Sequence, residues 1–416
     1  MKYIENLRTK KAFEIIFFST VVFSFLLWLL YIFIDGSSSA QFNIFFQRCE
    51  DFMADSSNVL GYSANRDPYH NLVYGLEEKA YPPLTYVIMY VMSRVVNANS
   101  FVDSENSYYY ISDNLQYFAL IFIFAILIVI VMYTLILVTK QGKMSVKIMT
   151  AVALCCSAPM LYSIERGNTI ILTVILCMVF LFYYNSENKV LREFALIALA
   201  IATAFKITPA LLGIMLLYNK QFKEAARTVI YGIIMVFVPF VFLHGGFSNI
   251  LLMFQNIKLN LKAYSSIEGC TLAASLNRFG QTFFNDFILS DQIIIVMRIV
   301  TMFISLLLLI AVPFFKTNWE KVAAVVLVLI ILPSHSGTYC ILYMIPVIVM
   351  FLNEEKRRKI DFLYLFCMIM ISWDFICNAT YIFNFNLAVP IMVTALSITG
   401  IMNIKQVLQQ RSNKNI

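Results

Sequence analysis

Long apolar runs alternate with short polar and basic segments along almost the entire chain. Runs of this kind predict helices that cross a lipid bilayer, so the sequence predicts an all-α, polytopic membrane protein with about twelve transmembrane helices. Several runs are shorter than the roughly 20 residues that a perpendicular span needs, so these extend into their flanks or cross a thinned bilayer. The predicted spans are residues 12–34, 116–139, 148–164, 169–185, 193–207, 209–219, 228–243, 292–315, 321–334, 339–352, 360–377 and 387–403.

The basic residues between these runs predict which connections face the cytoplasm. Of the 31 Lys and Arg residues, 21 lie in alternate connections and in the two terminal segments. Cytoplasmic loops carry an excess of Lys and Arg, so both termini are predicted to be cytoplasmic. The basic segments are residues 1–11, 140–147, 186–192, 219–227, 316–321, 353–359 and 404–416.

Two long segments, 35–115 and 244–291, then face outward. No repeat and no change in composition divides the chain, so residues 1–416 are expected to form a single transmembrane domain.

The excess of Lys and Arg in cytoplasmic loops also decides whether and how two ambiguous apolar stretches, residues 193–219 and 84–96, cross the membrane. A break between Lys206 and Pro209 divides residues 193–219 into two helices and keeps the basic residues that flank them on one side. Residues 84–96 are predicted to form a re-entrant or interfacial helix on the outer face. A span there would place the basic segment 140–147 outside.

Composition excludes a soluble protein. Hydrophobic residues make up 60% of the chain and charged residues 13%, whereas soluble domains carry about 25% charged residues. The formal net charge of +7 is dispersed in short clusters, which indicates membrane sidedness and no nucleic-acid partner. The expected location is the plasma (inner) membrane, crossed several times. The spacing of the eight cysteines does not match that of a zinc site. Cys49 and Cys270 both lie in outward segments, where they form either a disulfide or two unpaired thiols.

Two aspartates, Asp51 and Asp55, follow the first span closely. If residues 50–55 are helical, Asp51 and Asp55 share one face, since positions i and i+4 are neighbours. A carboxylate held at the membrane surface is suited to take a proton from a sugar hydroxyl, provided that partial desolvation raises its pKa. The alternative is that these acids form a solvated loop surface.

Three basic residues lie near the predicted outward ends of spans: Arg166, Lys206 and His335. Ionisable groups near the bilayer are usually paired or functional, and a bound phosphate would offset the cost of burying these three. A half-helix N-terminus at Asn168 would add hydrogen-bond donors to such a phosphate site. The alternative is that the long side chains extend to the interface without binding anything.

Motifs for other chemistries are missing from the sequence. It contains no phosphate-binding P-loop, no dinucleotide-binding glycine motif, no HExxH and no GxSxG. ATP hydrolysis, zinc proteolysis and a serine nucleophile are therefore not expected, and we expect no metal and no cofactor.

Short motifs in the two outward segments and at span ends resemble those of a known enzyme group. These motifs are Asp51-Phe52, Asp67-Pro68-Tyr69, Tyr81-Pro82-Pro83-Leu84, Arg166-Gly167-Asn168, Lys206-Ile207-Thr208-Pro209 and Ser275-Leu276-Asn277-Arg278. In order and placement they resemble the GT-C superfamily of glycosyltransferases, most closely its polyprenol-phosphate-mannose-dependent mannosyltransferase-like family. The resemblance runs from about residue 12 to residue 350. It departs where Glu165-Arg166-Gly167-Asn168 stands in place of the family's frequent Gly-Gln-x-Asn, which bears on the identity of the donor.

The resemblance implies a metal-independent, inverting transferase with its active site on the extracytoplasmic face. The donor would be a mannose-like hexose or a pentose on a polyprenyl phosphate, and the acceptor a glycan or glycolipid of the cell envelope. Asp51 stands where the family places its catalytic aspartate, with Asp55 as the second candidate. Arg166, Lys206 and His335 would bind the donor phosphate, and Asn168, Tyr81 and Arg278 would contact the substrates.

Two other functions fit the same pattern of spans. An O-antigen-type polysaccharide polymerase would have a similar number of helices and would use a lipid-diphosphate donor. A lipid or sugar transporter would show internal repeats, which this sequence lacks, and its key residues would lie near the bilayer midplane.

Overall fold

The structure is a computed structural model that describes residues 9–35, 53–73, 75–95, 115–263, 269–284, 287–333, 336–372 and 384–413. Asp51, Cys49 and His335 lie outside the described residues. The described chain is helical throughout, apart from an isolated bridge between Gly269 and Ser336. The predicted all-α class is therefore confirmed.

The chain forms two compact units, each assembled from separate stretches of sequence. Unit 1 comprises Met1–Gln41, Tyr133–Met160 and Ser265–Ile416, and unit 2 comprises Phe42–Met132 and Leu161–Tyr264. The helices within unit 1 are α2 (Lys10–Asp35), α7 (Met144–Cys155), α14 (Leu272–Phe283), α15 (Asp291–Ala311), η10 (Val312–Phe314), α16 (Asn318–Ile331), η11 (Thr338–Tyr343), α17 (Met344–Asn353), α18 (Asp361–Ser372) and α19 (Asn384–Ser412).

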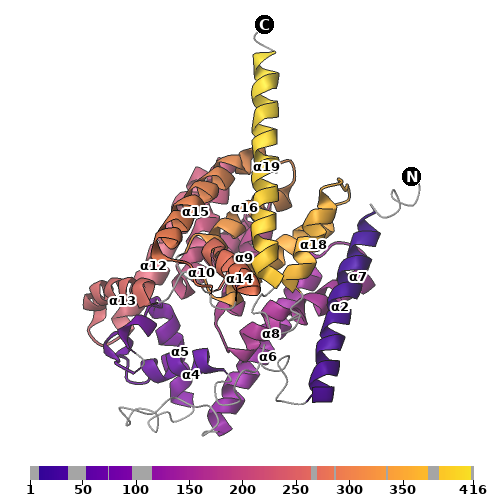
Figure 1. The fold of residues 1–416 in the computed structure, drawn as a ribbon. Coiled ribbons are helices and arrows are strands. Elements are labelled where there is room, and N and C mark those ends of the chain that lie inside the picture. The colour runs from indigo at the N-terminus through magenta and orange to yellow at the C-terminus, as the bar shows by residue number, and fades with distance from the viewer. Residues whose placement is uncertain are drawn as a thin grey trace. The chain divides into compact units, whose positions relative to one another are not determined.

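Unit 2 contains the segments that carry most of the candidate residues. Figure 1 labels most of the α-helices of the chain. Its helices are α4 (Ala54–Ser63), η3 (Pro68–His70), η4 (Leu76–Glu78), α5 (Pro83–Val95), α9 (Ile170–Tyr183), α10 (Lys189–Phe205), η7 (Thr208–Gly213), α11 (Ile214–Tyr218), α12 (Phe222–Phe237), η8 (Val238–Phe242), η9 (Gly246–Ser248) and α13 (Asn249–Ala263). Helices α6 (Leu115–Thr139) and α8 (Ala158–Glu165) each continue from one unit into the other.

In the residues that the structure describes, each predicted apolar run is largely helical, but the twelve spans are not confirmed. Among the described residues, five helices are long and apolar enough to cross a membrane, and six if the bent pair α7 and α8 forms one span. The other runs form shorter helices. Helix α9, with 14 residues, is about 21 Å long, whereas the hydrocarbon core is about 30 Å thick. The five helices are Lys10–Ile34, Ala119–Thr139, Phe222–Phe242, Asp291–Phe314 and Asn384–Gln410.

The predicted break after residue 205 is confirmed. Helix α10 ends at Phe205, and Lys206 has an extended backbone with φ −145° and ψ 131°. Pro209 stands in the first turn of η7, where its missing N–H costs no hydrogen bond. The break leaves the Lys206 side chain just beyond the end of α10.

Small residues explain the close packing at the centre of unit 2. Helix α10 packs against both α9 and α12. Its buried face is rich in alanine, with Ala195, Ala198 and Ala202 almost free of solvent contact. Small side chains let helix backbones approach closely, as they do in membrane bundles. This rigid layer supports the turns that carry Arg166 and Lys206.

In unit 1, α2 is fixed by contacts to segments that are distant in sequence. Lys140 and Glu14 form a buried ion pair at 2.5 Å. The Phe13 ring packs against Phe362, with ring centroids 4.9 Å apart, and the Arg357 guanidinium lies 4.5 Å from the same ring. Helix α2 is therefore held by both α6 and the region around α18.

Candidate functional site

The N-terminus of α4 is joined to the turn between α8 and α9 by backbone hydrogen bonds. The Met53 amide donates to the Glu165 carbonyl at 2.6 Å, and the Asp55 amide donates to the Arg166 carbonyl at 3.1 Å. The Ser56 hydroxyl donates to the Gly167 carbonyl. Amides of the first helical turn lack partners within their own helix, so α4 begins where this turn supplies them.

Glycine is required at position 167 for two reasons. Its φ is +61°, in the left-handed region that residues with side chains rarely adopt. A Cβ atom there would lie 2.9 Å from Ser56 Oγ and 3.0 Å from Met53 Cβ. Met53 is itself left-handed, with φ 56°, so two adjacent turns meet at their tightest points. The close contact between α4 and the 165–168 turn depends on the missing side chain.

Replacing Gly167 with alanine is expected to destabilise the protein more than the same change at Gly246. Gly246 has a similar φ of +53°, but nothing lies within 4 Å of its Cβ position. Both variants carry left-handed strain of about 1 kcal/mol, and only Gly167→Ala adds crowding of about 1–3 kcal/mol. Thermal unfolding of the detergent-solubilised variants measures the difference. Equal losses of Tm would show that the contact with Met53 and Ser56 is unimportant.

Asp55 pairs with Arg166 and Asn168 across this contact. Arg166 donates to Asp55 Oδ1 from Nη2 at 2.7 Å and from Nε at 3.2 Å, and Asn168 Nδ2 donates to Oδ2 at 2.6 Å. Asp55 lies in the first turn of α4, where the helix dipole also stabilises a negative charge. Both carboxylate oxygens of Asp55 therefore accept charge-assisted or amide hydrogen bonds.

Asn168 connects this cluster to the start of α9. Its Oδ1 accepts from the Ile170 amide at 2.9 Å, while its Nδ2 donates to Asp55. The side chain thus satisfies an amide of the first turn of α9, as a capping residue does. The predicted helix N-terminus next to Asn168 is that of α9. One of its backbone amides, that of Ile170, already donates to the Asn168 side chain.

Tyr81 and Lys206 lie beside the same cluster. Lys206 Nζ lies 5.3 Å from the centroid of the Tyr81 ring, within the range of a cation–π interaction. Burial raises the pKa of the Tyr81 phenol, as do the charges of Asp55 and Glu78. A hydrogen bond with Asn168 and the charge of Arg166 act in the opposite direction. Tyr81 is therefore a neutral phenol that contacts Lys206 and experiences the charges of Asp55, Glu78 and Arg166.

Glu78 and Lys79 belong to this polar region, although sequence reasoning missed them. Burial raises the pKa of Glu78, the charge of Lys79 lowers it, and the charge of Asp55 raises it. Burial lowers the pKa of Lys79 to about 8, against the charges of Glu78 and Glu77. The charged run 77–79 directly before the Tyr81-Pro82-Pro83 turn is the signal that could have identified them.

Lys79 fastens the segment that leads to Tyr81. Its side chain is fully buried, and Nζ donates to the carbonyls of Val73 and Gly75, the latter at 2.7 Å. The same Nζ lies 3.8 Å from the centroid of the Tyr62 ring on α4. We call residues 69–73 and 75–79 the strap. Lys79 therefore links two parts of the strap to each other, and it links the strap to α4.

Some predicted site residues lie elsewhere or cannot be placed. Asp51 and His335 lie outside the described residues. The helix that contains Asp55 begins at Ala54, after the left-handed Met53. The expected pairing of Asp51 with Asp55 stays a prediction, because Asp51 lies outside the described residues. Arg278 belongs to unit 1, where it lies on α14 and donates to Gln281 Oε1 at 3.4 Å.

The pairing of Cys49 with Cys270 stays a prediction, because Cys49 is outside the described residues. Cys270 is buried in unit 1.

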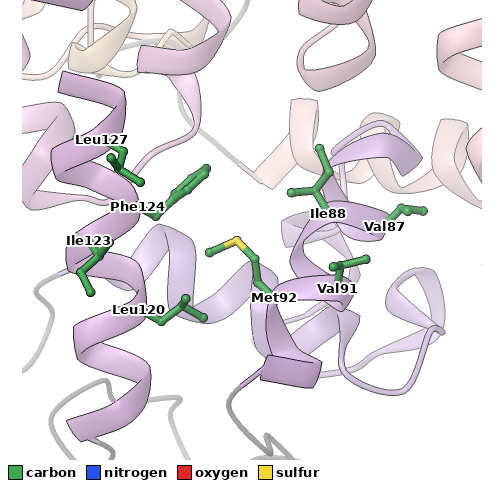
Figure 2. A pocket seen from close by; sticks show the side chains of 8 residues that line it. All are labelled: Val87, Ile88, Val91, Met92, Leu120, Ile123, Phe124 and Leu127. Atoms are coloured by element: carbon green, nitrogen blue, oxygen red, sulfur yellow. The ribbon is translucent and has the colours of Figure 1, made fainter. Parts of the chain in front are cut away.

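An apolar pocket of about 340 Å³ lies between α5 and α6 in unit 2. Figure 2 shows Phe124 of α6 and Met92 of α5 pointing into the space between the two helices. The remaining lining residues are Val87, Ile88, Val91, Leu120, Ile123 and Leu127. Phe124 also lines a second cavity of about 20 Å³ that reaches Gly167 and Asn168. One phenylalanine therefore separates the apolar pocket from the polar cluster.

A metal site is not found in the described part of the chain. No group of three or more His, Cys, Asp or Glu side chains there is arranged to hold a metal ion. The chemistry of the cluster is that of two cations, an amide, a phenol and carboxylates.

Comparison with known proteins identifies the family. The family model described as Glycosyltransferase family 87 matches residues 80–334, more than half of the 416 residues. The match includes Tyr81, Arg166, Asn168, Lys206 and Arg278. No curated protein and no solved structure matches the chain significantly. With its membrane-length apolar helices, the chain is a membrane protein that belongs to glycosyltransferase family 87.

Proposed function

We propose that the protein transfers a sugar from a polyprenyl-phosphate donor to a glycan or lipid acceptor on the extracytoplasmic face of the membrane. One observation carries this proposal. Lys206 lies over the ring of Tyr81, the charge of Arg166 acts on the phenol of the same residue, and the same unit contains an apolar pocket. Phe124 lines both this pocket and the small cavity that reaches Asn168. A donor with a phosphate, a sugar and a long apolar tail has the matching chemistry.

The reaction would proceed with inversion at the anomeric carbon. An acceptor hydroxyl oxygen forms a bond to that carbon while the bond from the carbon to the phosphate oxygen breaks. The phosphate leaves with the electron pair, and the hydroxyl proton passes to a carboxylate. Asp51 is the proposed base, because an aspartate just after the first span can be partly desolvated at the membrane surface.

The cations would act on the leaving group. Negative charge grows on the phosphate as its bond to the sugar breaks, so fixed positive groups stabilise the transition state more than the ground state. Arg166 and Lys206 are the proposed phosphate ligands, with His335 as a third. Asn168, Tyr81 and Arg278 are proposed to contact the substrates.

Asp55 has a different proposed role from Asp51. Its two oxygens already accept hydrogen bonds from Arg166 and Asn168, so it is poorly placed to receive a proton from an acceptor. Instead it fixes the direction of the Arg166 guanidinium. We therefore treat Asp55 as a positioning residue in the proposed reaction.

A transfer assay with the purified protein in detergent tests the proposed function. A radiolabelled sugar on polyprenyl phosphate is expected to be transferred to a membrane-extracted acceptor. Detergent abolishes any gradient, so product formation excludes transport. Transfer from a polyprenyl-diphosphate donor but not from the monophosphate would favour the polymerase and contradict the proposal.

Filling the apolar pocket tests whether it holds the donor tail. Leu120→Trp, in the pocket lining, is expected to raise KM for a long-chain donor about tenfold or more, because the tail loses its apolar contacts. A short-chain, water-soluble donor should show little change. Ile126→Trp is the matched control, since Ile126 is exposed on the same helix and does not line the pocket. Equal effects on long and short donors would exclude the pocket as the tail site.

A further inference from the structure

Helix α13 turns asparagine side chains toward the protein and exposes several large apolar side chains. Its inward face is formed by Asn249, Met253, Asn256 and Asn260, of which the first three are buried. These positions recur at intervals of three and four residues, so they form one stripe along the helix. A surface helix of a soluble protein shows the opposite arrangement.

The inward asparagines bind the strap. Asn256 Nδ2 donates to the Tyr69 carbonyl at 3.2 Å, and Asn260 Nδ2 donates to the Glu77 carbonyl at 2.9 Å. Carbonyl groups that are withdrawn from water need such partners. The asparagines therefore hold the strap, which contains Glu78 and ends two residues before Tyr81.

The outward side of α13 is apolar, with two lysines. Leu251 is 72% exposed and Phe254 is 53% exposed, and Leu259 and Leu261 are exposed as well. Lys258 and Lys262 are exposed beside them. A helix with exposed large apolar side chains and flanking lysines has the composition of a helix that lies in a membrane interface.

The apolar surface of α13 is continuous along the chain with that of a membrane-length helix. The segment Phe222–Phe242 is long and apolar enough to span the bilayer. At its end Val241 and Phe242 are exposed, and the exposed Phe247 follows just before α13 begins at Asn249. The chain thus passes directly from a candidate span to the outward side of α13.

We propose that α13 lies in the lipid interface, with Phe254 and Leu261 in contact with acyl chains and Lys258 and Lys262 at anionic phosphate headgroups. Phe254 and Leu261 are seven residues apart, two helical turns, and so share one side. The lysine stems lie along the apolar surface while their ammonium groups reach the headgroups. Through Asn256 and Asn260 the interface helix sets the position of the strap relative to the membrane surface.

Depth-dependent fluorescence quenching in nanodiscs with brominated phospholipids tests this proposal without relying on activity. Phe254→Trp is expected to be quenched about twofold or more beyond its matched control, Gln255→Trp, at the neighbouring position on the polar flank of the helix. The signal of the parent protein, which has three tryptophans, is subtracted. Equal quenching at the two positions, or none at Phe254→Trp, would overturn the proposal even if sugar transfer is normal.

The lysines are tested by changing the lipid charge. In the Phe254→Trp background, Lys258→Gln combined with Lys262→Gln is expected to reduce quenching in nanodiscs that contain phosphatidylglycerol. In phosphatidylcholine alone the effect should be much smaller, because the attraction of the lysines is to the anionic headgroup. The same loss in both lipids would contradict the headgroup contact.

Discussion

Asp51→Asn is expected to abolish sugar transfer while leaving expression and membrane insertion unchanged. Asparagine has nearly the same shape as aspartate but cannot accept the proton of the attacking hydroxyl. General base catalysis typically contributes about 10²–10⁴-fold in rate, and the loss should appear in kcat. Initial rates with the polyprenyl-phosphate donor, at equal amounts of folded protein, measure the effect.

Asp55→Asn is the matched control for this prediction. It removes the other acid of the same segment, and its effect is expected to be smaller because Asp55 orients Arg166 and does not receive the proton. If Asp51→Asn turned over donor at the wild-type rate, Asp51 could not be the base. If Asp55→Asn alone abolished transfer, the two roles would have to be exchanged.

The second large effect is expected for Arg166→Gln. Removing one fixed donor to a developing negative charge typically lowers kcat about 10²–10³-fold, and the affinity for the donor should change less. Lysine is not expected to restore the rate, because Arg166 reaches Asp55 through both Nε and Nη2, which a single ammonium group cannot reproduce. Single-turnover rates with the donor at saturation give the kcat effect directly.

A second arginine serves as a control for the loss of an ion pair without the loss of a catalytic group. Arg227 forms an ion pair with Glu193 at 2.5 Å in the same unit, away from the predicted site motifs, and Arg227→Gln should leave kcat within about twofold of the wild-type value.

A double-mutant cycle then tests whether Asp55 acts through Arg166. The losses from Asp55→Asn and Arg166→Gln should be clearly non-additive, because one residue acts through the other. Additive losses would show that the two side chains act independently.

The sequence predicted the positions of the helices well, because long apolar runs have few other structures available. The break at Lys206 followed from Pro209 and from the charges on either side, and the structure confirms it. The number of spans was harder to predict. Runs such as 169–185 are apolar enough, but the helix that forms there, Ile170–Tyr183, is too short for a perpendicular span.

The partners of the candidate residues could not be predicted in the same way. Arg166 and Asp55 are 111 residues apart, and only the folded chain brings them together. The sequence indicated that both lie on one face of the protein, but it assigned one to phosphate binding and the other to catalysis. Gly167 was the available signal for a tight contact, since a glycine in a charged turn often marks a backbone approach.

The orientation of helix α13 could not be predicted from the pattern of hydrophobic and polar residues alone. Asn256 and Asn260 appear in the sequence as polar positions of an outward loop, which suggests solvent contact. They face inward because the strap beside them offers unpaired carbonyl groups. The need of these carbonyl groups for hydrogen-bond donors arises only in the tertiary structure, so no periodic apolar pattern in the sequence indicates it.

The contacts of α2 impose an order on biosynthesis. Phe362 and Glu355, which contact this helix, are translated some 345 residues after it. Of the charged residues that pair with α2, Lys140 is translated before Glu355. The Glu14–Lys140 pair can therefore form before the segment around Glu355 is made. A nascent chain stalled before residue 351 would keep that pair and leave the Phe13 ring without Phe351, Arg357 and Phe362. Termination between residues 140 and 351 should therefore yield a protein in which α2 keeps its ion pair with Lys140 but lacks its aromatic partners.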